Sequence, residues 1–190
     1  MASKESSFRN MVITLLVVTA VASTALAYIN ELTKGPIAEA KLKAKLEAIG
    51  KVVPAFDNNP SDEVYLIPSD LGDLECYPAK SGDQLVGTAI STLTKMGFSG
   101  LIRIMVGLAP DGTIINTSVL EHAETPGLGT KMTEPKFKNQ FVDLNPGAVN
   151  MKVDKDGGVI DGITATTITS RAFCDAVQRA YDAYMKGGQQ

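Results

Sequence analysis

The pattern of apolar and polar positions divides the chain into an apolar N-terminal run and a longer mixed region. Residues 11–29 carry no charged side chain. As a helix this run is about 28 Å long, close to the hydrocarbon thickness of a bilayer, and it predicts a membrane span. A cleaved signal peptide is the alternative, because Lys4 and Arg9 precede the run and residues 25–27 have the small-x-small form of a cleavage site.

The basic residues before the span indicate its orientation. By the positive-inside rule the N-terminus is cytoplasmic, and everything from Asn30 onward is exported. We therefore predict a cytoplasmic segment over 1–10, a transmembrane helix over 11–29, a connecting amphipathic helix over 30–55 and a folded domain over 56–190. The expected location is the cytoplasmic (inner) membrane, as a single-pass protein with its C-terminal domain on the extracytoplasmic side.

A helical repeat follows a predicted break at residues 35–36, and Pro54 ends it. Its apolar positions recur every three or four residues, with lysines and glutamates between them, at Leu42, Leu46, Ile49 and Val53. This spacing predicts an amphipathic helix.

Short β-branched runs predict an antiparallel sheet in the exported part. Residues 56–83 are rich in Asp, Asn, Pro, Ser and Gly, which predicts loops around one strand at 64–67. Further strands are predicted over 84–92, 101–108 and 113–120, with a hairpin turn at Asp111-Gly112 before the last. We expect one face of the last strand to carry Ile114, Asn116, Ser118 and Leu120.

A final helix closes the predicted fold. Thr169 or Ser170 is expected to cap it. Its apolar positions are Phe173, Ala176, Val177, Ala180 and Tyr184. The fold class is therefore α+β: an N-terminal transmembrane helix followed by an exported domain with an antiparallel sheet flanked by helices.

The amino-acid composition argues against several classes of function. A net charge of -3, a pI of about 5.2 and the absence of tryptophan argue against a nucleic-acid partner. Cys76, Cys174 and His122 are the only cysteines and the only histidine, too few for a four-ligand structural zinc site, and we predict no metal. The two cysteines either pair after export or remain separate buried thiols.

The first candidate site, residues 121–130, follows the last predicted strand. Glu124 and Thr125 offer hydrogen bonds to a polar ligand, and amides around Gly127 and Gly129 form either an anion-binding nest or an ordinary turn. A hydrolase that uses His122 with Glu121 or Glu124 is a further hypothesis, although no nucleophile motif accompanies these residues.

The second candidate site, residues 161–172, has five hydroxyl side chains and leads directly into the final helix. Serine and threonine at a helix start either cap its free amides or help to hold a phosphate there. The chain has no Walker A motif, no dinucleotide glycine pattern and no Gly-x-Ser-x-Gly elbow, so the residues alone indicate an exported α+β domain with a phosphate site.

At these two sites the chain resembles the FMN-binding G subunit of the Rnf electron transport complex and its relative, the C subunit of the sodium-translocating NADH:quinone reductase. In that family an Asp precedes a Ser/Thr-Gly-Ala-Thr tetrad, whose last Thr carries FMN through a phosphoester. The resemblance implies a covalent FMN on Thr167. Its motif also includes Asp161, Gly162, Thr164, Ala165 and Thr166.

The family's Glu-Thr-Pro-Gly-Leu-Gly signature matches residues 124–129. The resemblance implies that this segment holds the isoalloxazine ring. The residues it assigns to that role are Glu124, Thr125, Gly127 and Leu128.

The chain departs from the family at two positions, because the family's Gly-Ala is Ala165-Thr166 here. Two adjacent hydroxyls then compete for the flavin. Thr167 is preferred over Thr166, because Asp161 before it and residues 168–170 after it keep the family's spacing. The methyl group at residue 165 raises the alternative of incomplete flavinylation.

The resemblance implies a membrane-anchored electron carrier with no complete active site of its own. Its complex would couple ferredoxin:NAD oxidoreduction to Na⁺ or H⁺ translocation. The implied partners are the other Rnf membrane subunits and, for maturation, a flavin transferase. The alternatives are the C subunit of a quinone reductase and an exported binding or scaffold module without a redox cofactor.

Overall fold

A computed structural model describes residues 7–187, in two compact units that divide between residues 43 and 44. Helix α1 (Phe8–Val52) has 45 residues and contributes to both units. The predicted break at residues 35–36 is wrong, because Pro36 lies inside this helix. Proline costs a helix one backbone hydrogen bond, and the alanines, lysines and glutamates after it have high helix propensity.

Residues 11–29 of α1, in the first unit, carry no charged side chain on any side. Leu15 and Leu16 are 66% and 63% exposed. The hydroxyls of Thr14 and Thr24 each donate to the carbonyl four residues earlier at 2.8 Å, so these polar groups are satisfied within the helix, as lipid requires. Within residues 7–187, α1 is the one helix long and apolar enough to cross a membrane. Lys4, which helped to orient the span, lies outside the described residues.

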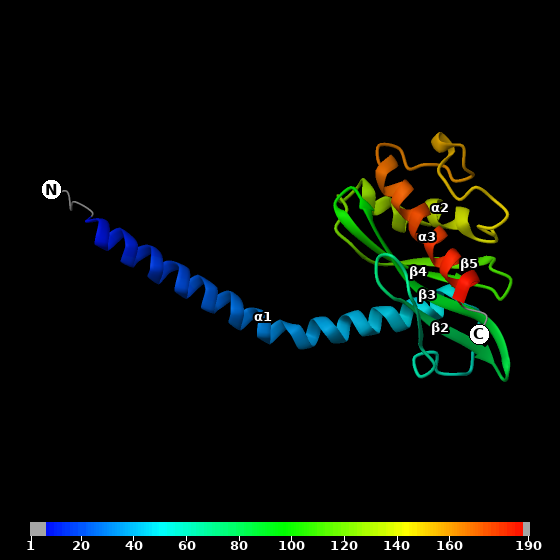
Figure 1. Cartoon of the computed structure of the whole chain (residues 1–190), viewed down its shortest axis with the longest axis horizontal. Coiled ribbons are helices and arrows are strands. Elements are labelled where there is room, and N and C mark those ends of the chain that lie inside the picture. The colour runs from blue at the N-terminus through cyan, green and yellow to red at the C-terminus, as the bar shows by residue number, and fades with distance from the viewer. Residues whose placement is uncertain (1–6, 188–190) are drawn as a thin grey trace. The chain divides into compact units, whose positions relative to one another are not determined.

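The second unit is built on a five-stranded antiparallel sheet, in which each strand pairs with the next along the chain (Figure 1). The strands are β1 (Tyr65–Ile67), β2 (Leu74–Ser81), β3 (Gln84–Gly97), β4 (Gly100–Leu108) and β5 (Ile114–His122). The predicted α+β class is confirmed.

Strand β2 lies in the stretch where the sequence predicted loops around a single strand. That prediction is wrong, and Pro78 explains part of the error, because proline is a poor residue for a central strand. β1 pairs only with residues 74–76 of β2. Pro78 therefore lies beyond the end of β1, where β2 is an edge strand and proline is tolerated.

Strand β5 does not keep the predicted residues on one face. The register of β4 with β5 shifts between Gly107 and Leu108, which pair with Asn116 and Ile114. The extra residue of this bulge turns Ile114 into one core cluster, whereas Leu120 packs against the other. A strict alternation along β5 was therefore the wrong expectation.

The two faces of the sheet are covered by different helices. Helix α3 (Thr167–Gly187) covers one face, and all five of its predicted apolar positions are buried there. On the other face, Ala48, Ile49 and Val52 from the end of α1 form a second cluster. A Cβ atom at Gly107 of β4 would lie 1.7 Å from the carbonyl oxygen of Val52, so glycine is required for this close packing.

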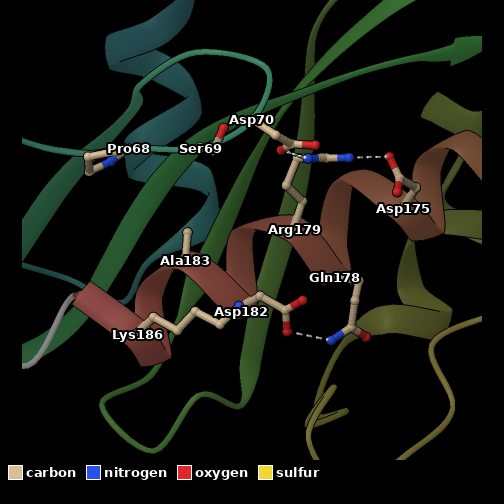
Figure 2. A pocket seen from close by; sticks show the side chains of 9 residues that line it. All are labelled: Pro68, Ser69, Asp70, Asp175, Gln178, Arg179, Asp182, Ala183 and Lys186. Atoms are coloured by element: carbon tan, nitrogen blue, oxygen red, sulfur yellow. Dashed lines mark hydrogen bonds and ion pairs between the residues drawn. The ribbon is translucent and has the colours of Figure 1, made fainter.

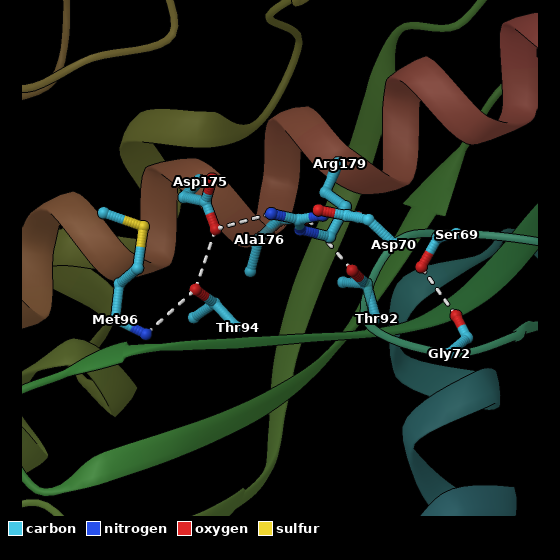
Figure 3. A network of polar contacts seen from close by, with 9 residues as sticks. All are labelled: Ser69, Asp70, Gly72, Thr92, Thr94, Met96, Asp175, Ala176 and Arg179. Atoms are coloured by element: carbon cyan, nitrogen blue, oxygen red, sulfur yellow. Dashed lines mark hydrogen bonds and ion pairs between the residues drawn. The ribbon is translucent and has the colours of Figure 1, made fainter.

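Polar contacts fix α3 over β3 (Figure 3). Thr92 donates its hydroxyl hydrogen to the carbonyl oxygen of Ala176 at 3.2 Å, and Thr94 donates to Asp175 Oδ2 at 2.7 Å. Arg179 pairs with Asp175 and with Asp70, which follows β1. These contacts hold the middle of α3 against β3 and β1, and the second candidate site lies at the start of the same helix.

Both cysteines are separate buried thiols within the larger core cluster, Cys76 on β2 and Cys174 on α3. Burial raises the pKa of each thiol to about 12. At neutral pH both are protonated and unreactive.

Candidate functional site

The structure brings the two sequence motifs together at one cavity of about 380 Å³. One side is formed by the segment after β5 and the tip of the β3–β4 hairpin, and the other by the start of α3. The lining residues are Phe98, Glu124, Thr125, Leu128, Gly129, Lys155, Ala165, Thr166, Thr167, Ile168 and Thr169.

Glu124 connects the two motifs. Its side chain is only 5% exposed, and its Oε2 accepts a hydrogen bond of 2.7 Å from the Thr169 hydroxyl in the first turn of α3. Its Oε1 accepts the backbone N–H of Ser99, at the tip of the hairpin, at 3.0 Å. One buried carboxylate therefore holds three separate segments around the cavity, as buried charges do when they are fully hydrogen-bonded.

Two glycines leave room for this carboxylate. A Cβ atom at Gly129 would lie 2.5 Å from Glu124 Oε2, and one at Gly97 would lie 2.8 Å from Oε1. Neither contact is sterically allowed. Gly129, the last residue of the signature, must therefore be glycine, because it packs directly against Glu124, the first residue.

The turn after Glu124 is closed by its own hydrogen bonds. The N–H of Gly127 donates to the Thr130 hydroxyl at 2.9 Å, and the N–H of Leu128 donates to the carbonyl of Thr125 at 3.2 Å. Because these amides are used inside the turn, the ordinary-turn interpretation fits better than an anion-binding nest. Gly127, with a φ of 74°, shapes the turn but does not line the cavity.

The second motif divides between two cavities. Ala165, Thr166 and Thr167 line the cavity described above, whereas Asp161, Gly162 and Thr164 line a neighbouring cavity of about 530 Å³. The backbone of Asp161 is held by the side-chain amide of Gln140, which accepts its N–H at 2.7 Å. The whole predicted motif is therefore close in space, but only its last three residues face Glu124.

Ala165 adopts a left-handed conformation, with a φ of 67°. This region favours glycine, and an alanine there is strained by roughly 1–2 kcal/mol. The strain lies at the position where the resembling family has glycine.

Helix α3 begins at Thr167, two residues before Thr169 and three before Ser170, the two expected caps. The carbonyl of Thr166 accepts the N–H of Ser170 at 3.1 Å, which starts the helix. Thr169 and Ser170, the predicted caps, are both buried. They use their hydroxyls inside the protein instead: Thr169 donates to Glu124, and Ser170 accepts the N–H of Ile163 at 2.9 Å.

The start of α3 leaves hydrogen-bond donors unused. Among the described residues, no hydrogen bond is made by the N–H groups of Thr167, Ile168 and Thr169. The Thr166 hydroxyl is buried and has no partner in the same part of the chain. Free amides at a helix N-terminus and its partial positive charge favour an anion such as a phosphate.

Apolar side chains are available on the same cavity for a flat ring. Phe98, Leu128 and Ile168 are 68%, 42% and 47% exposed, although all three are large and apolar. The unused donors and these apolar side chains fit a ligand with a phosphate at one end and an aromatic ring at the other.

Phe98 and Lys155 were missed in the sequence. Phe98 lies at the hairpin tip between two glycines, and an aromatic residue in such a turn is a signal that was available. Lys155 reaches the cavity from a short 3-10 helix (Asp154–Asp156), and no local pattern marks it.

Of the residues in the hydrolase hypothesis, Glu124 lines the cavity, whereas His122 and Glu121 do not. His122 Nδ1 accepts the backbone N–H of Glu124 at 3.2 Å, and Glu121 lies 3.7 Å from Arg103.

Another hollow of about 360 Å³ lies beside the C-terminal half of α3 (Figure 2). Its carboxylates already have partners, since Asp70 and Asp175 pair with Arg179 and Asp182 accepts from the Gln178 amide at 2.9 Å. It is a weaker candidate than the cavity at the start of α3, because neither of the two sequence motifs lines it.

The comparisons with known proteins first define a class. Residues 97–182 match the family described as FMN-binding domain. This range contains both motifs, Phe98 and Lys155. The chain therefore carries an FMN-binding domain, and the donors and apolar side chains of its cavity fit that ligand.

The relatives then define the particular family. The chain is 36% identical to the G subunit of the ion-translocating oxidoreductase complex of Yersinia pestis, over 88% of this chain and 86% of the relative. It is 35% identical to the G subunit of the Cereibacter sphaeroides complex of the same name, over 84% and 76%. The chain belongs to this G-subunit family, which confirms the resemblance. It is also similar to the crystal structure of Shewanella oneidensis NqrC, with 18% identity, coverage of 72% and 67%, and a TM-score of 0.48.

Proposed function

We propose that this chain is the membrane-anchored, electron-carrying subunit of an Rnf-type complex, with FMN attached covalently to Thr167 through a phosphoester. The observation that carries the proposal is the single cavity that joins Glu124 to the start of α3, in a member of the G-subunit family. The complex would couple ferredoxin:NAD oxidoreduction to Na⁺ or H⁺ translocation, with the other membrane subunits as partners.

The position of Thr167 in α3 supports Thr167 over Thr166 as the attachment site. Both side chains line the cavity. Thr167 is also the first residue of α3, beside the unused amides. A phosphate on Thr167 would therefore lie where the helix favours negative charge.

Flavin, when bound, supplies one- and two-electron chemistry, and the protein supplies its position. Phe98, Leu128 and Ile168 would cover the ring and exclude water from it. Lys155 contributes a positive charge to the same cavity. Glu124 would act indirectly, because its two oxygens already accept hydrogen bonds from Ser99 and Thr169.

We also propose a topology in which residues 1–10 are cytoplasmic, 11–29 span the membrane and the FMN-binding domain is on the extracytoplasmic side. Support comes from the charge-free run inside α1 and its exposed apolar surface. The connecting segment of residues 30–55 is helical as far as Val52, and its last turns belong to the folded unit.

The test is to coexpress the full chain with a flavin transferase, separate it by denaturing electrophoresis and view it under ultraviolet light. We expect a fluorescent band, and peptide mass mapping should find the FMN adduct on Thr167. Thr167→Val should abolish the band, and Thr166→Val should keep it. An adduct on Thr166 would correct the site, and the lack of any adduct beside a modified positive control would favour a binding or scaffold module.

A further inference from the structure

Among the described residues that line the cavity, the Thr166 hydroxyl is the one side-chain donor that is both buried and unpaired. In the part of the chain that the structure describes, its oxygen has no hydrogen-bond partner, although the Thr166 side chain lines the cavity. A buried hydroxyl without a partner costs free energy, and native proteins seldom retain one without a reason.

The backbone of Thr166 offers no explanation, because it is fully used. Its N–H donates to the carbonyl of Ile163 at 3.1 Å, and its carbonyl accepts both the N–H and the hydroxyl of Ser170 at 3.1 Å. Only the hydroxyl is left over. It lies beside three amides that are also unused, those of Thr167, Ile168 and Thr169.

We infer that the Thr166 hydroxyl is a phosphate-binding donor, which hydrogen-bonds a non-bridging oxygen of the flavin phosphate while Thr167 carries the ester. This inference rests on the proposed function of the cavity. Because Thr166 already lines the cavity, a change of its χ1 rotamer turns the hydroxyl toward a ligand there. A hydroxyl donating to a charged phosphate oxygen makes a charge-assisted hydrogen bond, stronger than one between neutral groups.

Non-covalent binding of two flavins by the full chain in detergent tests this role. The parent protein is Thr167→Val, which cannot form the ester. FMN and riboflavin share the ring and the ribityl chain, and only FMN has a phosphate. Fluorescence quenching should show that Thr166→Val weakens FMN binding about tenfold, the effect of losing a hydrogen bond to a charged group. Riboflavin binding should stay within about twofold, and Thr166→Ser should restore FMN binding.

Stability without ligand gives an independent readout. Valine has nearly the shape of threonine and no unpaired hydroxyl, so Thr166→Val should raise the thermal midpoint of the ligand-free protein by about 2–4 °C while it weakens FMN binding. A purely structural role of the hydroxyl would instead lower the midpoint and weaken both flavins alike.

The outcomes distinguish a failure of the inference about Thr166 from a failure of the proposed function. If Thr166→Val leaves FMN affinity unchanged, or weakens riboflavin as much as FMN, the inference about Thr166 is wrong and the FMN site stands. If the Thr167→Val parent binds neither flavin although the wild-type chain is flavinylated, the inference about Thr166 fails alone. If the wild-type chain also carries no flavin, the proposed function fails, and the role of Thr166 fails with it.

Discussion

The two sides of the cavity use their polar groups in opposite ways. We call one side the carboxylate wall, formed by Glu124 and Gly129 at the cavity and by Gly97 and Ser99, which contact Glu124. The other is the helix-start wall, residues 165–169. On the carboxylate wall both oxygens of Glu124 accept hydrogen bonds from within the protein. On the helix-start wall three amides and one hydroxyl have no hydrogen-bond partner within residues 7–187, and Ala165 is strained.

This difference indicates that the two walls have different roles. Groups that are satisfied within the protein hold the cavity in shape, and groups that are left unsatisfied are available to a ligand. Substitutions on the carboxylate wall should therefore affect stability most. Substitutions on the helix-start wall should affect ligand binding more than folding.

The largest expected effect comes from removing the carboxylate. Glu124→Ala leaves the Ser99 amide and the Thr169 hydroxyl without their acceptor and should destabilise the protein by about 3 kcal/mol, measured by chemical denaturation in detergent. Glu121→Ala is the control and should cost less than about 1 kcal/mol, because its pair with Arg103 is half exposed. Equal losses for the two variants would contradict the role of the carboxylate wall.

A smaller effect is expected from Gly129→Ala, whose new methyl group must displace the Glu124 side chain. The expected loss is about 2 kcal/mol in the same denaturation experiment, typical of overpacking. Gly162→Ala is the matched control in the other motif, since its Cβ would make an ordinary contact of 3.4 Å with Asp154. A tolerated Gly129→Ala would mean that the carboxylate is not held as tightly as the geometry indicates.

On the helix-start wall, one substitution should improve stability. Ala165→Gly removes the strain of the left-handed residue and should stabilise the protein by about 0.5–1 kcal/mol, after the entropy of glycine in the unfolded chain is subtracted. The same change at Ala123, which has no positive φ, should destabilise instead. If flavin attachment is incomplete in the natural sequence, mass spectrometry should find a higher modified fraction in Ala165→Gly.

The smallest effect concerns pH. Arg171, in the first turns of α3, donates two hydrogen bonds to Asp156 at 2.6 and 2.7 Å, which holds the pKa of that carboxyl below its usual value. A lowered folded-state pKa stabilises the protein above the unfolded-state pKa of about 3.9, and this contribution is lost as the pH falls through the folded-state pKa.

Thermal midpoints measured from about pH 7 down to about pH 2 should therefore show wild type above Asp156→Asn at neutral pH and the two converging in acid. A difference that stays constant over this range would mean that the ion pair with Arg171 is not its cause. Because the pair is exposed, the effect should also shrink at high salt.

Much of the fold could be predicted because local patterns determine it. The apolar spacing of α3 and the β-branched runs of β3, β4 and β5 each identify an element without reference to the rest of the chain. β2 could not be found this way, because Pro78 is acceptable only once β1 is known to end before it. The continuity of α1 through Pro36 was missed for a similar reason, because one local signal outweighed the good helix formers around it.

The two motifs of the site could be predicted from the sequence. The contacts that join them, and the residues that tertiary packing adds, could not. Glu124 and Thr167 were named from sequence segments, but the hydrogen bond from Thr169 to Glu124 joins residues 45 positions apart. Lys155 reaches the cavity only through tertiary packing. The left-handed conformation of Ala165 is a property of the folded loop, since alanine itself disfavours it.

The end of α1 determines where the folded domain can be cut. Ala48, Ile49 and Val52 are at most 3% exposed, and their cluster covers Met105 on β4. A soluble fragment that begins at residue 56, after the helix, would expose this apolar face to water and should aggregate. A fragment that begins at Ala44, where the compact unit begins, retains the covering turns and is the better starting point for crystallisation.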